Sequence, residues 1–128
     1  MDLRARRSLL SSTPNPDRLL DYVCSLGSPV DTNIADYAIQ FRVRYVPDRV
    51  ILCRDSLNDY LSQTGCLSWL SLEEYAVTIL NDINDELIAR WIEVTLSLEV
   101  EGHIHEVKLE ERQPDWEDQG ILARLPIS

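Results

Sequence analysis

Thiol groups are the first side chains in this sequence that could do chemistry. The chain has three cysteines, Cys24, Cys53 and Cys66, and no two of them form a C-x-x-C pair. An odd number of well-separated cysteines predicts neither a disulfide framework nor a zinc knuckle. We therefore expect reduced thiols.

The two histidines of the chain, His103 and His105, stand two residues apart. On a strand they would share one face and could ligate a metal ion together with an acid such as Glu73 or Asp36. Because the chain has no further histidine, we favour a hydrogen-bonded surface pair over a metal site. No metal is expected.

Acidic residues dominate the charge, with 22 Asp and Glu against 12 Lys and Arg and a net charge of -10. This charge repels phosphate backbones, and no strong basic patch offsets it, so nucleic-acid binding is not expected. Between residues 99 and 118, eight acidic residues face only Lys108 and Arg112. We interpret this stretch as a solvated face, in preference to a site for a cation or a basic partner.

The length of 128 residues is enough for one domain with a core and too short for two ordinary domains. Hydrophobic residues make up 45% of the chain and charged residues 27%, as in globular proteins. No apolar run approaches the roughly 20 residues that cross a bilayer. The start, MDLRARRSLLSS, has no apolar core of signal-peptide length. We expect a cytoplasmic protein without a membrane partner.

Alternation of apolar and polar residues predicts the strands that would position these side chains. Residues 37–46 alternate as a half-buried strand, with Tyr37, Ile39, Phe41, Val43 and Tyr45 on one face. After the turn at Pro47, residues 49–53 are expected to pair back as a hairpin. Residues 91–100 and 103–111 alternate again, and Glu101-Gly102 joins them tightly.

Two helices are predicted between these strand pairs. Residues 56–63 are helix-like and Gly65 ends them. Ser71 and Glu74 form a capping box, and apolar residues then recur at steps of three and four through Leu87. The order strand, strand, helix, helix, strand, strand predicts an α+β fold with helices on one face of a mainly antiparallel sheet.

Turn-forming residues suggest the boundaries of this domain. Residues 8–35 contain Pro14, Pro16, Gly27 and Pro29, which indicates loops around a short apolar segment. We expect a leader and loop segment over residues 1–35 and the folded domain over residues 36–113. The tail, residues 114–128, is expected to dock on the body or on a neighbouring subunit.

Three blocks of the sequence carry the motifs of one known family in the right order. The stretch YVPDRVILCRDSLNDYL aligns without a gap to a signature that reads roughly Y-I-P-D-x-x-x-V-E-S-K-S-L-K-L-Y-L. This stretch resembles the signature of the 7-cyano-7-deazaguanine nitrile reductases of the queuosine pathway. Downstream, NDINDELIARWIEVTLSLEVEGHI resembles the family's N-D-L segment, P-R-Y-I-E-V strand and G-G-I turn, and upstream TPNPDRLLDYVCSLGSP is similar to its Pro-Asn-Pro leader. The resemblance spans residues 13–113.

The resemblance implies a tunnelling fold. In that fold protomers assemble side by side into a barrel, and ligand pockets lie at the seams between them. A homo-oligomer, or an assembly with a paralogous subunit, is therefore expected.

The resemblance also implies that the family's reaction is lost. Ser28 stands before Pro29 where the family has its nucleophilic Cys, and an unactivated hydroxyl is a far weaker nucleophile than a thiolate. Cys24 could substitute only if the loop were rebuilt. Asp36 best matches the family's general acid, although a strand-start or turn-capping role is equally open.

The position of the family's reductant is altered as well. Asp55 and Asn58 replace two Lys that favour the phosphates of NADPH, and Cys53 replaces a Glu. An acid and a neutral group in place of two cations disfavour a dinucleotide. No cofactor is expected.

The family feature that we expect to be retained is a carboxylate that anchors the ligand. Glu73 matches the Glu that accepts two N-H donors of a purine or pterin ring, with Leu72 in place of the preceding His. The alternative is an ordinary helix N-terminal carboxylate. Trp69 and Tyr75 could stack on a ring or belong to the core. His103 replaces a Gly of the turn and would intrude where backbone approaches the ligand.

Three hypotheses follow for the function. The first is a divergent relative that binds a purine, pterin or deazapurine-like heterocycle through Glu73 without nitrile reduction. The second is an enzyme of changed chemistry on a related ring, using Asp36, Ser28 or the histidine pair. The third is a scaffold, or a partner subunit of an active paralogue.

Overall fold

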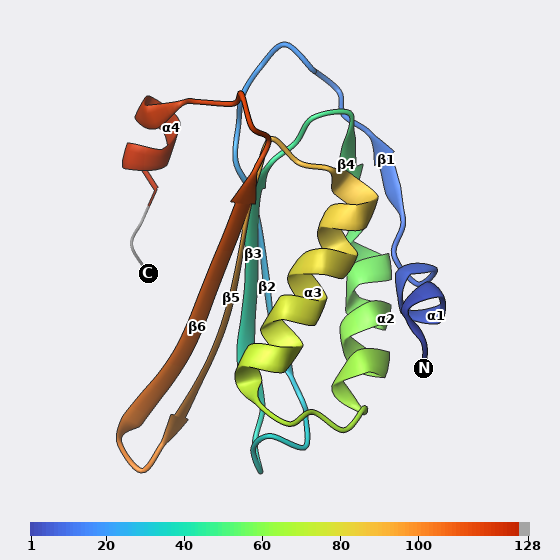
Figure 1. The fold of residues 1–128 in the computed structure, drawn as a ribbon, viewed down its shortest axis with the longest axis vertical. Helices are drawn as coiled ribbons and strands as arrows, with labels where there is room; N and C mark the ends of the chain where they lie inside the picture. Colours follow the sequence, from blue (N-terminus) through green and yellow to red (C-terminus); the bar gives the residue numbers. More distant parts are fainter. Residues whose placement is uncertain (126–128) are drawn as a thin grey trace.

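The computed structural model describes residues 1–125 and shows helices on one face of an antiparallel sheet (Figure 1). The main sheet has the strand order β2-β3-β5-β6. Its strands are β2 (Cys24–Val30), β3 (Ile39–Val46), β5 (Trp91–Val100) and β6 (His103–Arg112). Helices α2 (Arg54–Gly65) and α3 (Leu72–Leu87) cover this sheet. The shorter elements are α1 (Leu3–Arg7), β1 (Ser12–Pro14), β4 (Val50–Leu52) and α4 (Gln119–Ala123).

The main core lies between the sheet and the two long helices. Alternate residues of β3 and β5 point toward the helices, as their sequence pattern predicts, and α3 contributes one apolar stripe. The buried side chains of this layer include Ile39, Phe41, Val43, Tyr45, Ile92, Val94, Leu96, Tyr75, Ile79 and Ile83. Tyr37 differs from its expected place in the strand, because β3 begins at Ile39 and Tyr37 is 47% exposed.

The predicted capping of α3 is confirmed. The Ser71 hydroxyl accepts a hydrogen bond from the Glu74 backbone N–H at 3.1 Å, and Glu74 Oε1 accepts one from the Leu70 N–H at 3.2 Å. The Ser71 bond satisfies a backbone donor that the first turn of a helix leaves open. The Glu74 bond reaches the N–H of Leu70, one residue before the N-cap, in place of the Ser71 N–H that a standard capping box uses. The start of α3 is therefore set by residues close to it in sequence.

The tight connection between β5 and β6 is also confirmed. Glu101 and Gly102 have φ of 52° and 82°, and Val100 pairs with His103 across the turn. Positive φ at both central residues gives the backbone twist that a two-residue hairpin requires. The turn fixes the register of all ten residue pairs between the two strands.

The expectation of loops over residues 8–35 is wrong for two segments. Residues 12–14 form β1, and residues 24–30 form β2, which pairs with β3 over seven residues. Gly27 and Pro29 conceal this strand in the sequence, but an edge strand tolerates both residue types. The expected domain boundary at residue 36 consequently falls between two paired strands of one sheet.

The expected hairpin between residues 37–46 and 49–53 is also wrong. β4 pairs with β1, as Ser12↔Leu52 and Pro14↔Val50, and not with β3. Both edges of β3 are already taken by β2 and β5. The Pro47-Asp48 turn therefore leads the chain out of the main sheet.

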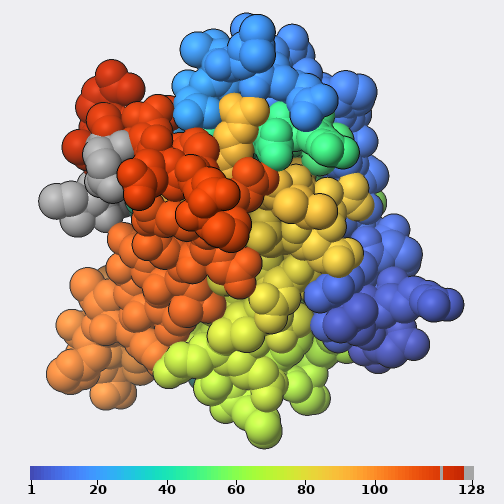
Figure 2. Space-filling model, turned by 45° about the horizontal axis from the view of Figure 1, so that its top comes forward, coloured from blue at the N-terminus to red at the C-terminus, as the bar shows by residue number. Residues whose placement is uncertain are grey.

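The face of the sheet opposite the helices is covered at one end by the C-terminal segment. Val46, Trp91 and Ile121 are buried together there, and Trp116 packs against them. The Trp116 indole N–H donates to Asp21 Oδ2 at 3.1 Å, and the red C-terminal segment lies beside the light-blue loop in Figure 2. The tail thus packs on the body as far as residue 125, and its residues 126–128 lie outside the described residues.

Beside this cluster, Arg44 and Glu93 form a buried ion pair with 2.6 Å between Arg44 Nη2 and Glu93 Oε1. Among residues 1–125, no helix has both the length and the apolar composition needed to cross a membrane.

Candidate functional site

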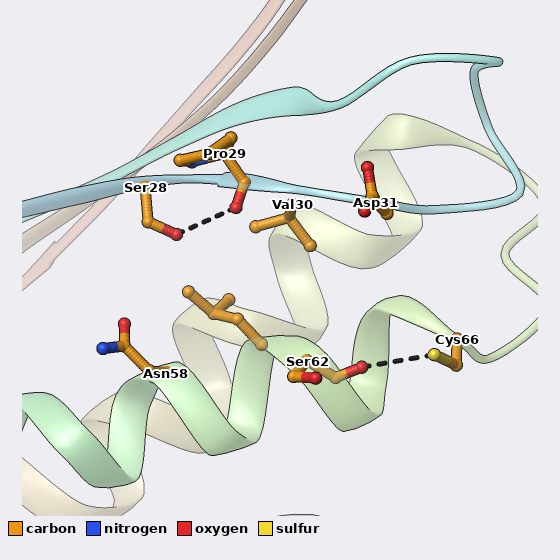
Figure 3. A pocket seen from close by; sticks show the side chains of 8 residues that line it. Ser28, Pro29, Val30, Asp31, Asn58, Ser62 and Cys66 are labelled. Atoms are coloured by element: carbon orange, nitrogen blue, oxygen red, sulfur yellow. Dashed lines mark hydrogen bonds between the residues drawn. The ribbon is translucent and has the colours of Figure 1, made fainter.

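Ser28 lines a pocket of about 450 Å³ between β2 and α2 (Figure 3). The strand side consists of residues 28–31, and the helix side consists of Asn58, Leu61, Ser62 and Cys66. Asn58 lies across the pocket from Ser28. The position that resembles the family's nucleophile is therefore accessible in this fold and is faced by a neutral amide.

No base activates the Ser28 hydroxyl within the described part of the chain. The Ser28 hydroxyl donates to the carbonyl of Pro29, with 3.0 Å from Oγ to the oxygen. A serine nucleophile requires a neighbouring base that removes its proton, usually at hydrogen-bond distance. Ser28 has the accessibility of a nucleophile without its activation.

Cys24 does not replace the missing thiolate. It lies on β2 four residues from Ser28, about 13 Å along an extended strand. Burial raises the pKa of the Cys24 thiol, which disfavours the thiolate. The position and the pKa of Cys24 both argue against a nucleophilic role.

The other two cysteines lie at the two ends of α2. Cys66 lines the Ser28 pocket, and its Sγ donates to the Ser62 carbonyl at 3.3 Å. Cys53 is the residue before the first turn, and hydrogen bonding from the Ser56 backbone N–H lowers its thiol pKa. Cys53 lies outside the Ser28 pocket.

Asp36 lies in the loop between β2 and β3, where it is exposed and does not line the Ser28 pocket. This loop is tied to the α2–α3 connection by Asn33. The Asn33 amide donates to the Trp69 carbonyl at 3.0 Å and accepts from the Trp69 N–H at 2.9 Å. The fold therefore holds the loop but does not bring Asp36 and Ser28 into one pocket.

Trp69 stacks on Tyr75, with 4.4 Å between ring centroids and 21° between ring planes. The indole N–H donates to the Thr64 carbonyl at 2.9 Å, and the Tyr75 hydroxyl lies 2.7 Å from Thr64 Oγ1. This stacking occupies one face of the Trp69 ring. Trp69 therefore helps to hold the α2–α3 connection against the core.

Glu73 lies in the first turn of α3, where its side chain is 58% exposed. Its Oε1 is 3.3 Å from Nε2 of His105 on β6. The capping bonds of this helix end are made by Ser71 and Glu74, as described for the fold. The Glu73 carboxylate is therefore not required to cap the helix.

His103 is exposed at the tip of the β5–β6 hairpin, on the same face of β6 as His105. The described residues contain no group of three His, Cys, Asp or Glu side chains that could hold a metal ion. Glu73 thus meets one histidine in this structure and not a ligand set.

The two parts of the candidate site lie at opposite edges of one sheet. Ser28 is on β2, which is one edge strand, and His105 is on β6, which is the other. The helix-facing sides of both strands carry these residues. One chain alone therefore does not place Ser28 beside Glu73.

Sequence reasoning missed polar side chains that line a second pocket on the helix-free face of the sheet, among them Arg42 and Thr95. The alternation of both strands does place them opposite the core. Their polar character suggested solvent contact, and no feature of either strand alone indicates the pocket.

Comparison with known proteins supports the fold. No protein-family model matches the sequence, and no curated protein matches it either. A solved structure that is similar is that of the archaeosine synthase QueF-Like in the apo form, with 17% sequence identity and a TM-score of 0.57. The match covers 70% of this chain and 91% of that chain. This chain therefore has the α+β tunnelling fold.

Proposed function

We propose that this chain is a divergent tunnelling-fold protein that binds a purine, pterin or 7-deazaguanine-like heterocycle at a seam between subunits. Glu73 anchors the ring, and NADPH-dependent nitrile reduction does not take place. The observation that carries the proposal is the Glu73 carboxylate, which is exposed in the first turn of α3 while Glu74 and Ser71 cap that helix.

The chemistry of Glu73 suits this ligand class. A carboxylate accepts two parallel N–H bonds from one edge of a heterocycle, as in bidentate recognition by charged groups. His105 approaches one of its oxygens at 3.3 Å, and the same imidazole could hold the carboxylate in place for a ligand.

The sheet edges favour a seam as the location of the site. β2 and β6 are the two edge strands of the four-stranded sheet, and an edge strand presents unpaired backbone groups that another chain can pair with. Pairing β2 of one subunit with β6 of the next would bring Ser28 of one protomer toward Glu73 of the other. Such an assembly, of identical subunits or with a paralogue, completes a pocket that one chain leaves open.

Three residues argue against nitrile reduction. Ser28 has no activating base within hydrogen-bond distance in the described residues. Asn58 faces Ser28 across the pocket, and Asp55 is exposed in the first turn of α2, where the resemblance expects cations. A hydroxyl without a base does not form the covalent adduct, and an acid in place of a cation repels a dinucleotide phosphate.

The test is a thermal-shift screen against guanine, pterins, 7-cyano-7-deazaguanine and NADPH. A ligand that binds only the native state must raise the melting temperature. We expect a heterocycle to do so in the wild type and not in Glu73→Gln, whereas the exposed control Glu117→Gln responds like the wild type. NADPH should have no effect.

Two results would contradict the proposal. An equal response of Glu73→Gln and wild type would remove Glu73 as the anchor. The absence of any response, in a protein that light scattering shows to be assembled, would favour a scaffold or a partner subunit of an active paralogue.

A further inference from the structure

We propose that the helix-free face of the sheet carries a second binding site, in which Arg42 binds the oxyanion of a small molecule, a phosphate or a carboxylate group. The site is a pocket of about 460 Å³ between β2, β3, β5 and β6. It lies across the sheet from Glu73 and does not depend on heterocycle binding.

Four polar side chains on two neighbouring strands form the floor of this pocket. Arg42 pairs directly with Thr95, and Gln40 pairs directly with Ser97, on the adjacent strands β3 and β5. Residues directly opposite in an antiparallel pair have Cβ atoms about 5 Å apart, and residues two apart on one strand share a face. All four side chains therefore point to one small area.

The Thr95 hydroxyl lacks a partner in this area. Thr95 is 7% exposed, and its Oγ1 is the one buried side-chain N or O atom without a hydrogen bond among the described residues. A buried hydroxyl without a partner destabilises a protein, and such a group calls for a specific explanation. A ligand oxygen in the pocket would accept a hydrogen bond from this hydroxyl.

The Arg42 guanidinium is also unpaired in the described part of the chain, where no hydrogen bond or ion pair to it occurs. Arg44 lies two residues further on the same face of β3, and its Nη2 is 2.6 Å from Glu93 Oε1. The carboxylate in the pocket, Glu106, lies on β6 and is 3.9 Å from the Lys108 ammonium. Because β5 separates β3 from β6, Glu106 stands about 10 Å from the Arg42 strand.

The β2 side leaves the pocket open. Gly27 pairs with Arg42 and Pro29 with Gln40, so no long side chain stands beside the guanidinium. A Cβ on Gly27 would lie 3.2 Å from the Phe41 carbonyl oxygen, closer than ordinary contact. The small residue at this position preserves both the pairing of the strands and the space next to Arg42.

The donors define the ligand class. A guanidinium presents a planar fork of N–H groups that matches two oxygens of a phosphate or a carboxylate. Two hydroxyls and a carboxamide add donors around the same point. In a chain of net charge -10, an anion requires such a local cation in order to bind.

The experiment is a titration of the full chain with sodium phosphate and with sodium malonate, against sodium chloride at matched ionic strength, followed by melting temperature and calorimetry. We expect saturable binding of phosphate or malonate in the wild type. Arg42→Gln should weaken binding, with a Kd at least about tenfold higher than that of the wild type. Arg54→Gln removes an exposed cation outside the pocket and should leave the Kd within about twofold.

Thr95→Val separates binding from folding. Valine matches threonine in shape and removes the hydroxyl that lacks a partner, so the variant should melt above the wild type without ligand. The same variant should show a smaller ligand-induced shift than the wild type. Binding of phosphate or of malonate shows whether the site prefers a phosphate or a carboxylate group.

The proposal is overturned if both anions act like chloride on the wild type, or if Arg42→Gln binds as tightly as the wild type. If Arg42→Gln fails to fold, the ligand-induced shift of Thr95→Val tests the site instead. An undiminished response in Thr95→Val would then overturn the site.

Discussion

The Tyr60 hydroxyl donates a 2.6 Å hydrogen bond to Asp82 Oδ2, and both side chains are buried between α2 and α3. Arg6 Nε donates to the same oxygen at 2.8 Å, and Arg7 Nε donates to Oδ1 at 3.0 Å. Asp82 is 1% exposed, so these three donors replace the water that a carboxylate requires. The arginines of the N-terminal segment thereby attach α1 to α3.

The first prediction concerns this carboxylate. Asp82→Asn removes the charge that three donors share and should lower the free energy of unfolding by about 1.5–3 kcal/mol, the range for hydrogen bonds to a charged group. Asp85→Asn is the control, because Asp85 is exposed and forms, within residues 1–125, a single ion pair with Arg7. Its effect should stay below about 0.5 kcal/mol. Urea unfolding measures both, and equal effects would contradict the buried role of Asp82.

The second prediction concerns alkaline pH. Burial raises the pKa of Tyr45 and Tyr60 above the ordinary value of 10, and it raises the pKa of Tyr75 to about 12. Since the unfolded chain loses these protons near pH 10, their contribution to stability is full below pH 10 and is lost as pH rises above it. The melting temperature should fall steeply between pH 10 and 12.

Absorbance at 295 nm tests this mechanism. The buried tyrosines should ionise together with the loss of the circular dichroism signal. Tyr75→Phe should retain more of its own neutral-pH stability at pH 11 than the wild type does. Ionisation of all tyrosines before unfolding would contradict the prediction.

The third prediction concerns Gly65 at the end of α2. A Cβ at this position would lie 2.5 Å from the Asp31 carbonyl oxygen, a backbone atom that cannot move aside cheaply. Gly65→Ala should therefore destabilise the protein by about 1–3 kcal/mol, the usual cost of overpacking. In Gly120→Ala the nearest atom is Asp118 Oδ1 at 3.6 Å, so the melting temperature should barely change. A neutral Gly65→Ala would show that α2 and the end of β2 separate easily.

The fourth prediction concerns acid pH. The Asp48 carboxylate accepts from Gln113 Nε2 at 2.9 Å and lies 3.4 Å from Arg90 Nη2. The hydrogen bond from Gln113, with the charge of Arg90, lowers the pKa of Asp48 below its ordinary value of 3.8. A lowered pKa contributes stability that is full above pH 3.8 and is lost as pH falls below it.

Asp48→Asn should remove this part of the acid sensitivity. The variant should be less stable than the wild type at pH 6, and the difference should shrink between pH 4 and 2. Urea unfolding at a series of pH values provides the measurement. A constant difference over this range would exclude ionisation of Asp48 as the cause.

Part of the fold could be read from local patterns. The capping residues of α3 and the two-residue turn between β5 and β6 lie next to the elements they define, so the sequence predicts both correctly. The period-two pattern likewise predicts which side of β5 joins the main core, the side of Ile92, Val94 and Leu96. Such features depend on neighbours within a few residues.

The candidate site required the resemblance and then the geometry. The sequence assigns Glu74 to a capping box, but it leaves Glu73 open between a ligand anchor and an ordinary helix N-terminal carboxylate. Only the structure shows that Glu74 bonds the Leu70 N–H while Glu73 remains exposed beside His105. The sequence also gives no sign that Thr95, on the polar side of its strand, is buried without a partner.

By itself, then, the sequence determined the α+β class, the boundaries of α3 and β5, and which side of each central strand faces the core, because these depend on local period and capping. Tertiary structure alone decided that β2 is an edge of the sheet, that β4 pairs with β1, and that Arg6 meets Asp82. Strand partners and buried polar contacts join segments far apart in the chain. These partners are selected by the relative stability of all possible pairings in the whole chain. A pattern within one segment therefore does not predict them.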